Sequence, residues 1–207
     1  MIRGPGLEYE RYDPVFFTGD AADSLRSPER PGLMLGGEIA VPKQRVLIAG
    51  ATGYLGKFIV KELKSRGYWV RALARDARKI EPLKQSVDDL FVGQATQPVT
   101  LSGICKGIDI VISCLGITRQ KDGLTYMDVD YQGNKNLLDE ALGENVPRFM
   151  YISVFNADRL RHLEIVRAKE KFADELKAAG LDHIIVRPNG FFSDMQEFFN
   201  MARSNFL

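Results

Sequence analysis

Three glycines recur at intervals of three in GATGYLG, residues 50–56, and no other stretch limits the possible folds as much. The apolar run 45–49 before it is typical of a strand, and the run 57–63 after it is typical of an amphipathic helix. A plain turn needs only one glycine, so the other two need a separate reason. The pattern predicts a tight strand-to-helix turn whose backbone closely approaches a ligand.

A helix that starts directly after such a turn offers unpaired amide groups and the positive end of its dipole, which together suit a pyrophosphate. We expect Gly50 to allow the sharp exit from the strand and Gly53 to let the backbone approach the phosphates. Gly56 is expected to let the helix pack tightly against the sheet, and Thr52 can add a hydroxyl donor. The alternative is a glycine-rich turn without a ligand.

The rest of the chain alternates between short apolar runs and amphipathic stretches. The strand-like runs are 46–49, 69–74, 90–93, 109–114, 148–153 and 183–188. Helical patterns span 54–66, 77–86, 125–143 and 160–179, with a weaker one near 98–106. This alternation predicts an α/β fold, a doubly wound parallel sheet of the Rossmann type with three layers. Ligands then bind at the edge where the parallel strands end.

Residues 1–43 show no helical or strand period, and we expect a flexible N-terminal extension, or else a strap packed on the domain through aromatic residues. Residues 44–207 are expected to form one dinucleotide-binding domain. Its last helix should begin near Phe192, which leaves little chain to cover a substrate. We therefore expect the domain to lack a full C-terminal substrate-binding portion, as in a piece of a longer protein.

Composition excludes several classes of function. The formal net charge of +1 and the dispersed charges argue against nucleic acid as a partner, because nucleic-acid binding needs a concentrated basic face. The two cysteines have no metal-type spacing, so no metal site is expected. No apolar run is long enough to span a membrane, and the start resembles no secretory signal. We predict a soluble intracellular protein, cytoplasmic or in an organelle stroma, of open oligomeric state.

The sequence resembles the short-chain dehydrogenase/reductase superfamily, most closely its extended or atypical members, the NmrA-like NAD(P)-binding proteins. The resemblance covers about residues 44–205. It rests on VLIAGATGYLGKFIVKEL, VRALARDARK, DIVISCLG, VDYQGNKNLLDEA, RFMYISV and GLDHIIVRPNGFF, in that order. It implies a nicotinamide dinucleotide as cofactor, with Tyr54 and Leu55 joining the glycines as binding residues.

The residue at the end of the second strand-like run bears on the choice of cofactor. Enzymes that prefer NAD usually have an acidic residue there for the ribose 2′-hydroxyl, whereas this chain has Arg75. A guanidinium can bind a 2′-phosphate through two hydrogen bonds, and Arg78 and Lys79 are close enough to help. Asp76 could instead serve the ribose or cap the next helix. We predict NADP, with NAD as the alternative and Arg75 as a solvated residue in that case.

The resemblance implies three further cofactor contacts. Cys114 and Gly116 end the fourth strand-like run, where family members line the adenine and ribose side. Pro188 lies in a segment that resembles the border of the nicotinamide, although it could simply shape a turn. Many relatives have an aspartate after the third strand, whereas this chain has Gly-Gln-Ala-Thr at 93–96, so we expect little contact there.

Reductases of this superfamily generally use a Tyr-x-x-x-Lys pair, in which the lysine lowers the pKa of the tyrosine and binds the nicotinamide ribose. In this chain the family's lysine falls on Lys169, but Ile165 replaces the tyrosine. Lys169 belongs to an apolar stripe, so it either reaches a ligand or extends to water. Ser153 is the best hydroxyl for holding a substrate oxygen, or it caps the next segment. Lys169 and Ser153 are the candidate catalytic residues.

Other candidates for these roles are weaker. Lys171, with Arg167 in place of the tyrosine, competes with Lys169 but lies on the solvated face. Either Tyr126 or Tyr131 is more typical of a core or groove wall than of an acid catalyst, and His162 more typical of a surface residue. The segment 130–133 resembles the family's Asn-x-x-Gly turn, with aspartate at the asparagine position.

Three functions fit these residues. The first is an NADP-dependent oxidoreductase, a reductase or an isomerase, acting on a small-molecule substrate. The second is an NADP-binding regulator that passes its state to a protein partner, and the third is an assembly factor for a larger complex. The missing tyrosine favours the second. We predict the oxidoreductase, with the regulator or assembly factor as the alternative.

Overall fold

The computed structural model describes residues 43–117, 123–191, 199, 200 and 203. Six parallel strands form one sheet in the order β3-β2-β1-β4-β5-β6. The strands are β1 Arg45–Ala49, β2 Trp69–Ala74, β3 Asp89–Val92, β4 Ile110–Ser113, β5 Arg148–Ile152 and β6 Asp182–Val186. This is the doubly wound Rossmann-type sheet that the alternating pattern predicts.

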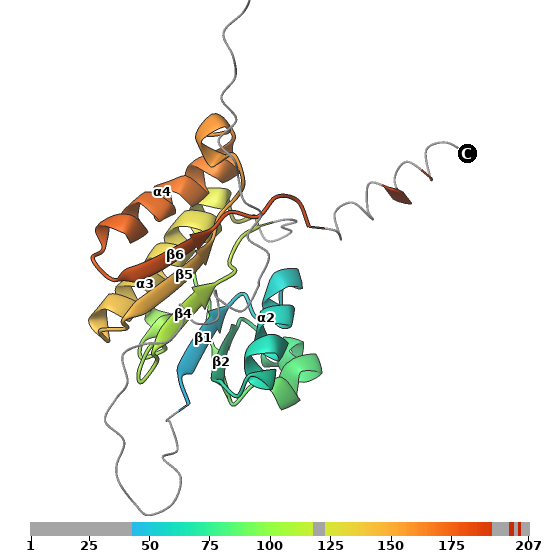
Figure 1. Ribbon diagram of the computed structural model, residues 1–207, viewed down its shortest axis with the longest axis vertical. Coiled ribbons are helices and arrows are strands. Elements are labelled where there is room, and N and C mark those ends of the chain that lie inside the picture. Colours follow the sequence, from blue (N-terminus) through green and yellow to red (C-terminus); the bar gives the residue numbers. More distant parts are fainter. Residues whose placement is uncertain (1–42, 118–122, 192–198, 201–202, 204–207) are drawn as a thin grey trace, which may run out of the picture. The chain divides into compact units, whose positions relative to one another are not determined.

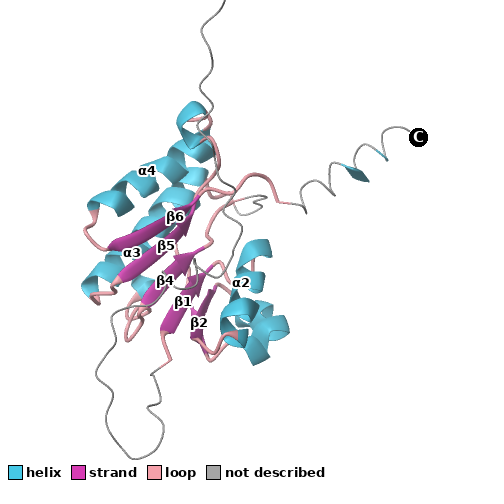
Figure 2. Ribbon diagram, in the orientation of Figure 1, coloured by secondary structure: helices cyan, strands magenta, loops and turns pink. Residues whose placement is uncertain are grey.

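The longer helices connect the strands in the expected places. The α-helices are α2 Tyr54–Ser65, α3 Asn134–Gly143 and α4 Glu164–Ala178. Short 3-10 helices are η1 Ala77–Ser86, η2 Pro98–Leu101 and η4 Ala157–Arg159, and η3 Met127–Gly133 is π-helical. Figure 1 shows α3 and α4 on one side of the sheet and α2 on the other, and Figure 2 shows the strands enclosed between these helices.

Alternate residues of the central strands face the two helical layers, as expected for a sheet covered on both faces. In β1, Leu47 and Ala49 belong to the core shared with α3 and α4, whose largest members include Phe149, Tyr151 and Phe172. On the other face, α2 buries Val60 and Leu63. The four residues 46–49 are fully buried. β1 is therefore a central strand, and the turn that follows it lies between the ends of β2 and β4.

The strand order reverses direction between β1 and β4. From β1 the chain moves outward to β2 and β3, and it then returns to the other side of β1 as β4, β5 and β6. The ends are in register, because Ala49 pairs with both Leu73 and Ser113. A crevice at such a reversal, beyond the carboxyl ends of the strands, is where open α/β sheets bind ligands.

The structure refines some predicted elements. The stretch 125–143 is not one α-helix, because a π-helical turn occupies 127–133. The helix predicted for 160–179 is α4, which spans Glu164–Ala178, and the short helix η4 lies before it. The pattern at 77–86 is 3-10 helical and contains Pro82. The extension predicted for 1–43, Lys43 excepted, lies outside the described residues, as does most of the helix predicted from Phe192. No helix among the described residues has both the length and the apolar character needed to cross a bilayer.

Candidate functional site

Two of the three glycines of the β1–α2 turn, Gly50 and Gly56, have backbone atoms where a side chain would begin. Gly50 has φ +79°, and a Cβ there would lie 2.8 Å from the Cys114 carbonyl oxygen. Gly53 donates its N–H to the Gly50 carbonyl at 3.0 Å and begins α2 as its N-cap. A Cβ at Gly56 would lie only 2.1 Å from that same carbonyl oxygen. The turn is therefore held tight between β4 and the first turn of α2.

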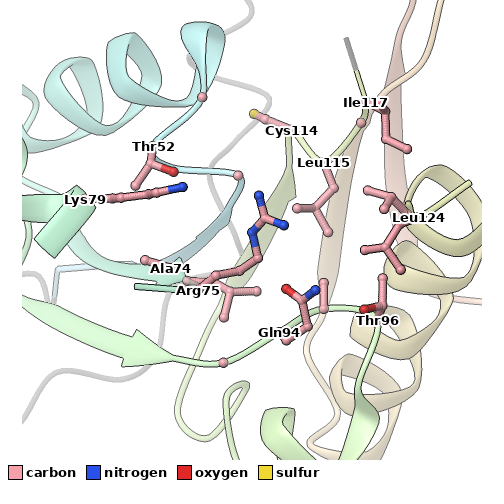
Figure 3. A pocket seen from close by; sticks show the side chains of 17 residues that line it. Thr52, Ala74, Arg75, Lys79, Gln94, Thr96, Cys114, Leu115, Ile117 and Leu124 are labelled. Atoms are coloured by element: carbon pink, nitrogen blue, oxygen red, sulfur yellow. The ribbon is translucent and has the colours of Figure 1, made fainter. Parts of the chain in front are cut away.

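A cavity of about 520 Å³ opens beside this turn, at the carboxyl ends of β1, β2, β3 and β4. Figure 3 shows side chains from these segments pointing into the same space. Six of the predicted site residues line it, namely Gly50, Thr52, Gly53, Arg75, Cys114 and Gly116. The remaining lining residues are Leu73, Ala74, Lys79, Gly93, Gln94, Ala95, Thr96, Leu115, Ile117, Leu124 and Val129.

Two cations enter the cavity from the end of β2. Arg75 extends into the space between the glycine turn and the segment after β4, and Lys79 reaches toward it from η1 (Figure 3). Asp76 instead caps η1, because its carboxylate accepts the Arg78 backbone N–H at 2.9 Å. The same carboxylate pairs with the Arg78 guanidinium at 2.7 Å, and this side-chain hydrogen bond lowers the pKa of Asp76 to about 2. Arg78 is thus held by Asp76 and is absent from the cavity lining.

The run after β3 forms a wall of the cavity that was not predicted from the sequence. Gly93, Gln94, Ala95 and Thr96 all line the cavity, although the run lacks the acidic residue common in relatives. A Cβ at Gly93 would lie 2.7 Å from the Thr100 carbonyl oxygen, so only glycine fits. The signal that could have revealed this wall is that glycine at a strand end, which indicates a close backbone approach.

The segment after β4 forms the opposite wall. Cys114 lines the cavity, and burial raises the pKa of its thiol to about 12, so the thiol stays protonated at neutral pH. Gly116 has a specific steric reason to be glycine. A Cβ there would lie 2.8 Å from Asp130 Oδ1 and 3.0 Å from Lys169 Nζ. The space that glycine leaves is therefore taken by two opposite charges behind the wall.

Lys169 forms an ion pair with Asp130, a partner that the sequence did not suggest. The Lys169 ammonium lies 2.9 Å from Asp130 Oδ1 and 3.5 Å from the Ile152 carbonyl oxygen. Asp130 belongs to the π-helical turn η3 and is fully buried, and its Oδ2 accepts the Ile117 N–H at 3.1 Å. The Lys169 side chain is 12% exposed. One carboxylate thus joins α4 to the cavity wall.

Ser153 follows β5 and is also bound to a charged partner. Its hydroxyl donates to Glu170 Oε1 at 2.6 Å, while Arg187 donates to Glu170 Oε2 at 2.7 Å. Glu170 is fully buried. An ionised carboxylate only accepts hydrogen bonds, so the Ser153 proton is committed to Glu170 and the Ser153 oxygen can offer a lone pair. The role of Ser153 toward a substrate stays a prediction.

Other residues named from the sequence lie outside the cavity lining. Tyr54, 46% exposed, contacts the Phe58 and Phe191 rings with centroids 5.4 and 5.8 Å away. The Pro188 carbonyl accepts the Phe155 N–H at 3.0 Å. Tyr131 donates its hydroxyl to Glu175 at 2.5 Å, a bond that raises the pKa of Tyr131 to about 12. The cofactor roles of Tyr54, Leu55, Gly56, Lys169 and Pro188 remain predictions.

Comparison with known proteins agrees with this geometry. Residues 50–201 match the family model described as NAD(P)H-binding. The photosystem II assembly factor Ycf39 of Cyanophora paradoxa is 33% identical over 150 residues, which are 72% of this chain and 46% of that protein. The chloroplastic divinyl chlorophyllide a 8-vinyl-reductase of Cucumis sativus is 32% identical over 167 residues, 72% of this chain and 39% of that protein.

The chain thus spans about half the length of the curated relatives it matches, or less. Among solved structures, a protein of the NAD-dependent epimerase/dehydratase type from Bacillus halodurans superposes with a TM-score of 0.62 and 25% identity, covering 70% of each chain. The family match is consistent with the glycine turn and with the cavity at the strand reversal, since both are features of dinucleotide-binding domains. The chain belongs to the NAD(P)H-binding family, as an NmrA-like Rossmann domain of the atypical short-chain dehydrogenase/reductase group.

Proposed function

We propose that the cavity binds NADP in preference to NAD, with the 2′-phosphate against Arg75 and Lys79. The observation that carries this proposal is the charge of the lining. Among the described residues that line the cavity, Arg75 and Lys79 are the charged side chains and none is a carboxylate. An acidic residue at this position would favour the ribose hydroxyls of NAD, whereas cations favour the additional phosphate.

The remaining parts of the dinucleotide follow from this placement. The pyrophosphate would lie over the turn residues Gly50, Thr52 and Gly53, at the amino end of α2. The adenine would lie between the run 94–96 and the apolar side chains of Leu115 and Val129, which line the same cavity. The nicotinamide half would extend toward Lys169 and Pro188, with Tyr54 and Leu55 beside the phosphates. When bound, the reduced cofactor would supply a hydride.

Calorimetric titration with NADPH and NADH tests this proposal. A charge-assisted hydrogen bond contributes about 1.5–3 kcal/mol, so Arg75→Ala should weaken NADPH binding about 10- to 100-fold and leave NADH binding nearly unchanged. Lys79→Ala should act in the same direction. Arg78→Ala is the matched control, since it removes a neighbouring cation that Asp76 holds outside the cavity lining. Equal weakening of both nucleotides by Arg75→Ala would contradict the proposal.

We further propose that the domain serves an oxidoreductase acting on a small-molecule substrate. The reductase among its relatives supports this reaction class, as does the Lys169 ammonium, which lies 3.5 Å from the Ile152 carbonyl oxygen at the end of β5. Lys169 would bind and orient the cofactor, and Ser153 Oγ would accept a hydrogen bond from a substrate hydroxyl. The test follows the absorbance of reduced nicotinamide while the protein is mixed with carbonyl and conjugated-alkene compounds.

A second function, a regulator or assembly factor that binds NADP, is supported by different observations. Ile165 occupies the place of the family's tyrosine, and the Ser153 proton is held by Glu170. One set of relatives consists of photosystem II assembly factors. Tight NADPH binding without hydride transfer to any tested compound would favour this function over the oxidoreductase.

A further inference from the structure

The pair Asp130–Lys169 places two opposite charges directly behind the cavity wall. Asp130 Oδ1 accepts no hydrogen bond from the described residues, although Lys169 Nζ lies 2.9 Å away, so the contact is ionic rather than an aligned hydrogen bond. Asp130 Oδ2 accepts the N–H of Ile117, which lines the cavity. The carboxylate is therefore fixed to the wall at one oxygen and to the ammonium at the other.

The ion pair lies against Gly116, one of the residues that line the cavity. Gly116 lines the cavity, and the place of its absent Cβ lies 2.8 Å from the carboxylate and 3.0 Å from the ammonium. Hence no side chain at this position separates the pair from the cavity. Burial reduces the screening of both charges by water and salt, so their fields extend into the adjacent space.

We propose that the Asp130–Lys169 pair sets the relative affinity of this site for the oxidised and the reduced dinucleotide. The proposal rests on the proposed function, in which the nicotinamide half lies toward Lys169. The two forms of the cofactor differ at the nicotinamide ring, which is cationic when oxidised and neutral when reduced. A nearby carboxylate favours the cationic ring, and a nearby ammonium disfavours it.

The two members of the pair therefore act in opposite directions. Removing the negative charge with Asp130→Asn should weaken NADP⁺ binding relative to NADPH. Removing the positive charge with Lys169→Met should strengthen NADP⁺ binding relative to NADPH. For charges within about 10 Å of the ring in a partly shielded site, each change should alter the ratio of the two dissociation constants about 3- to 30-fold. A merely structural role would weaken both forms in parallel and leave the ratio unchanged.

The experiment titrates NADP⁺ and NADPH separately into the wild-type chain and its variants at one pH and one salt concentration. The ratio Kd(NADP⁺)/Kd(NADPH) should rise in Asp130→Asn and fall in Lys169→Met. The double variant removes both charges and should return the ratio toward the wild-type value. Lys171→Met is the matched control, because it removes a lysine of the same helix that lies 3.9 Å from the Tyr131 ring centroid; its ratio should equal that of the wild type.

Ratios within about twofold of the wild type in both single variants, or shifts of the same sign, overturn the inference while the proposed NADP binding stands. If one single variant does not fold, the other single variant and the double variant still differ by one charge. The ratio Kd(NADP⁺)/Kd(NADPH) must then be higher in whichever of these two proteins carries the more positive charge, and equal ratios refute the inference. A wild-type chain that binds neither nucleotide refutes both the inference and the proposed function.

Discussion

Replacing Gly56 with alanine should destabilise the domain more than any other single methyl group added at the β1–α2 turn. The new Cβ would lie 2.1 Å from the Gly50 carbonyl oxygen, 2.8 Å from the Gly50 carbonyl carbon and 2.9 Å from Ala51 Cα. All three atoms belong to the backbone, so no side-chain rotation relieves the clash. Ordinary van der Waals contact begins at 3.4 Å, so α2 and the turn must separate by more than an ångström.

Overpacking of a buried site usually costs about 1–3 kcal/mol, and a clash with rigid backbone belongs at the upper end. For a domain of this size, about 3 kcal/mol lowers the melting temperature by about 6–12 °C. The separation also lifts α2 away from β1, which weakens the packing of Val60 and Leu63, both buried on the inner face of the helix. Because the same displacement moves the amides of the turn, NADPH affinity should fall as well.

Thermal unfolding followed by circular dichroism measures the first effect, and calorimetric titration measures the second. Gly143→Ala is the control, since Gly143 ends α3 and a Cβ there meets nothing within 4 Å. That variant should be stabilised by about 0.5–1 kcal/mol, because alanine loses less backbone entropy on folding. A Gly56→Ala protein that melts within about 2 °C of the wild type and binds NADPH normally would refute the steric reasoning.

Two further predictions concern protonation. Burial raises the pKa of the Cys114 thiol to about 12. Iodoacetamide should therefore alkylate this thiol at neutral pH at least about a hundredfold more slowly than an exposed cysteine. Rapid modification of Cys114, seen by peptide mapping, would contradict its burial. The pKa of Asp76 is lowered to about 2 from 3.8, chiefly by its hydrogen bond with the Arg78 side chain. The stability that Asp76 contributes is therefore present above about pH 4 and lost as the pH falls toward 2. In urea unfolding across this range, the wild type should lose its advantage over Asp76→Ala as the pH falls, and a constant difference would contradict the assignment.

The strands were predictable because their signal is local. A run of apolar residues bounded by turn residues indicates a buried parallel strand, and β2 was predicted with its observed bounds, 69–74. The types of helix were not predictable in the same way. A periodicity near 3.6 residues cannot distinguish the π-helical turn 127–133 from an α-helix, or the 3-10 helix 77–86 from either.

In the candidate site, features formed by consecutive residues were predictable from the sequence, whereas contacts between distant residues were not. The glycine turn was predicted because its strand, turn and helix are consecutive. The partner of Lys169 was not, because Asp130 lies in a different element and only the fold brings the two together. The sequence also could not separate Arg78 from Lys79, since both follow Arg75 closely. The structure separates them because the carboxylate of Asp76 captures Arg78.

Two adjacent residues of α4 bind different elements of the domain. Lys169 reaches Asp130 and, through its carboxylate, the amide of Ile117, whereas Glu170 reaches Arg187 just past the end of β6. Two consecutive residues of α4 therefore connect the cavity wall with the edge strand β6. Arg187, the first residue after β6, is therefore bound to the helix whose preceding residue, Lys169, contacts the cavity wall through Asp130.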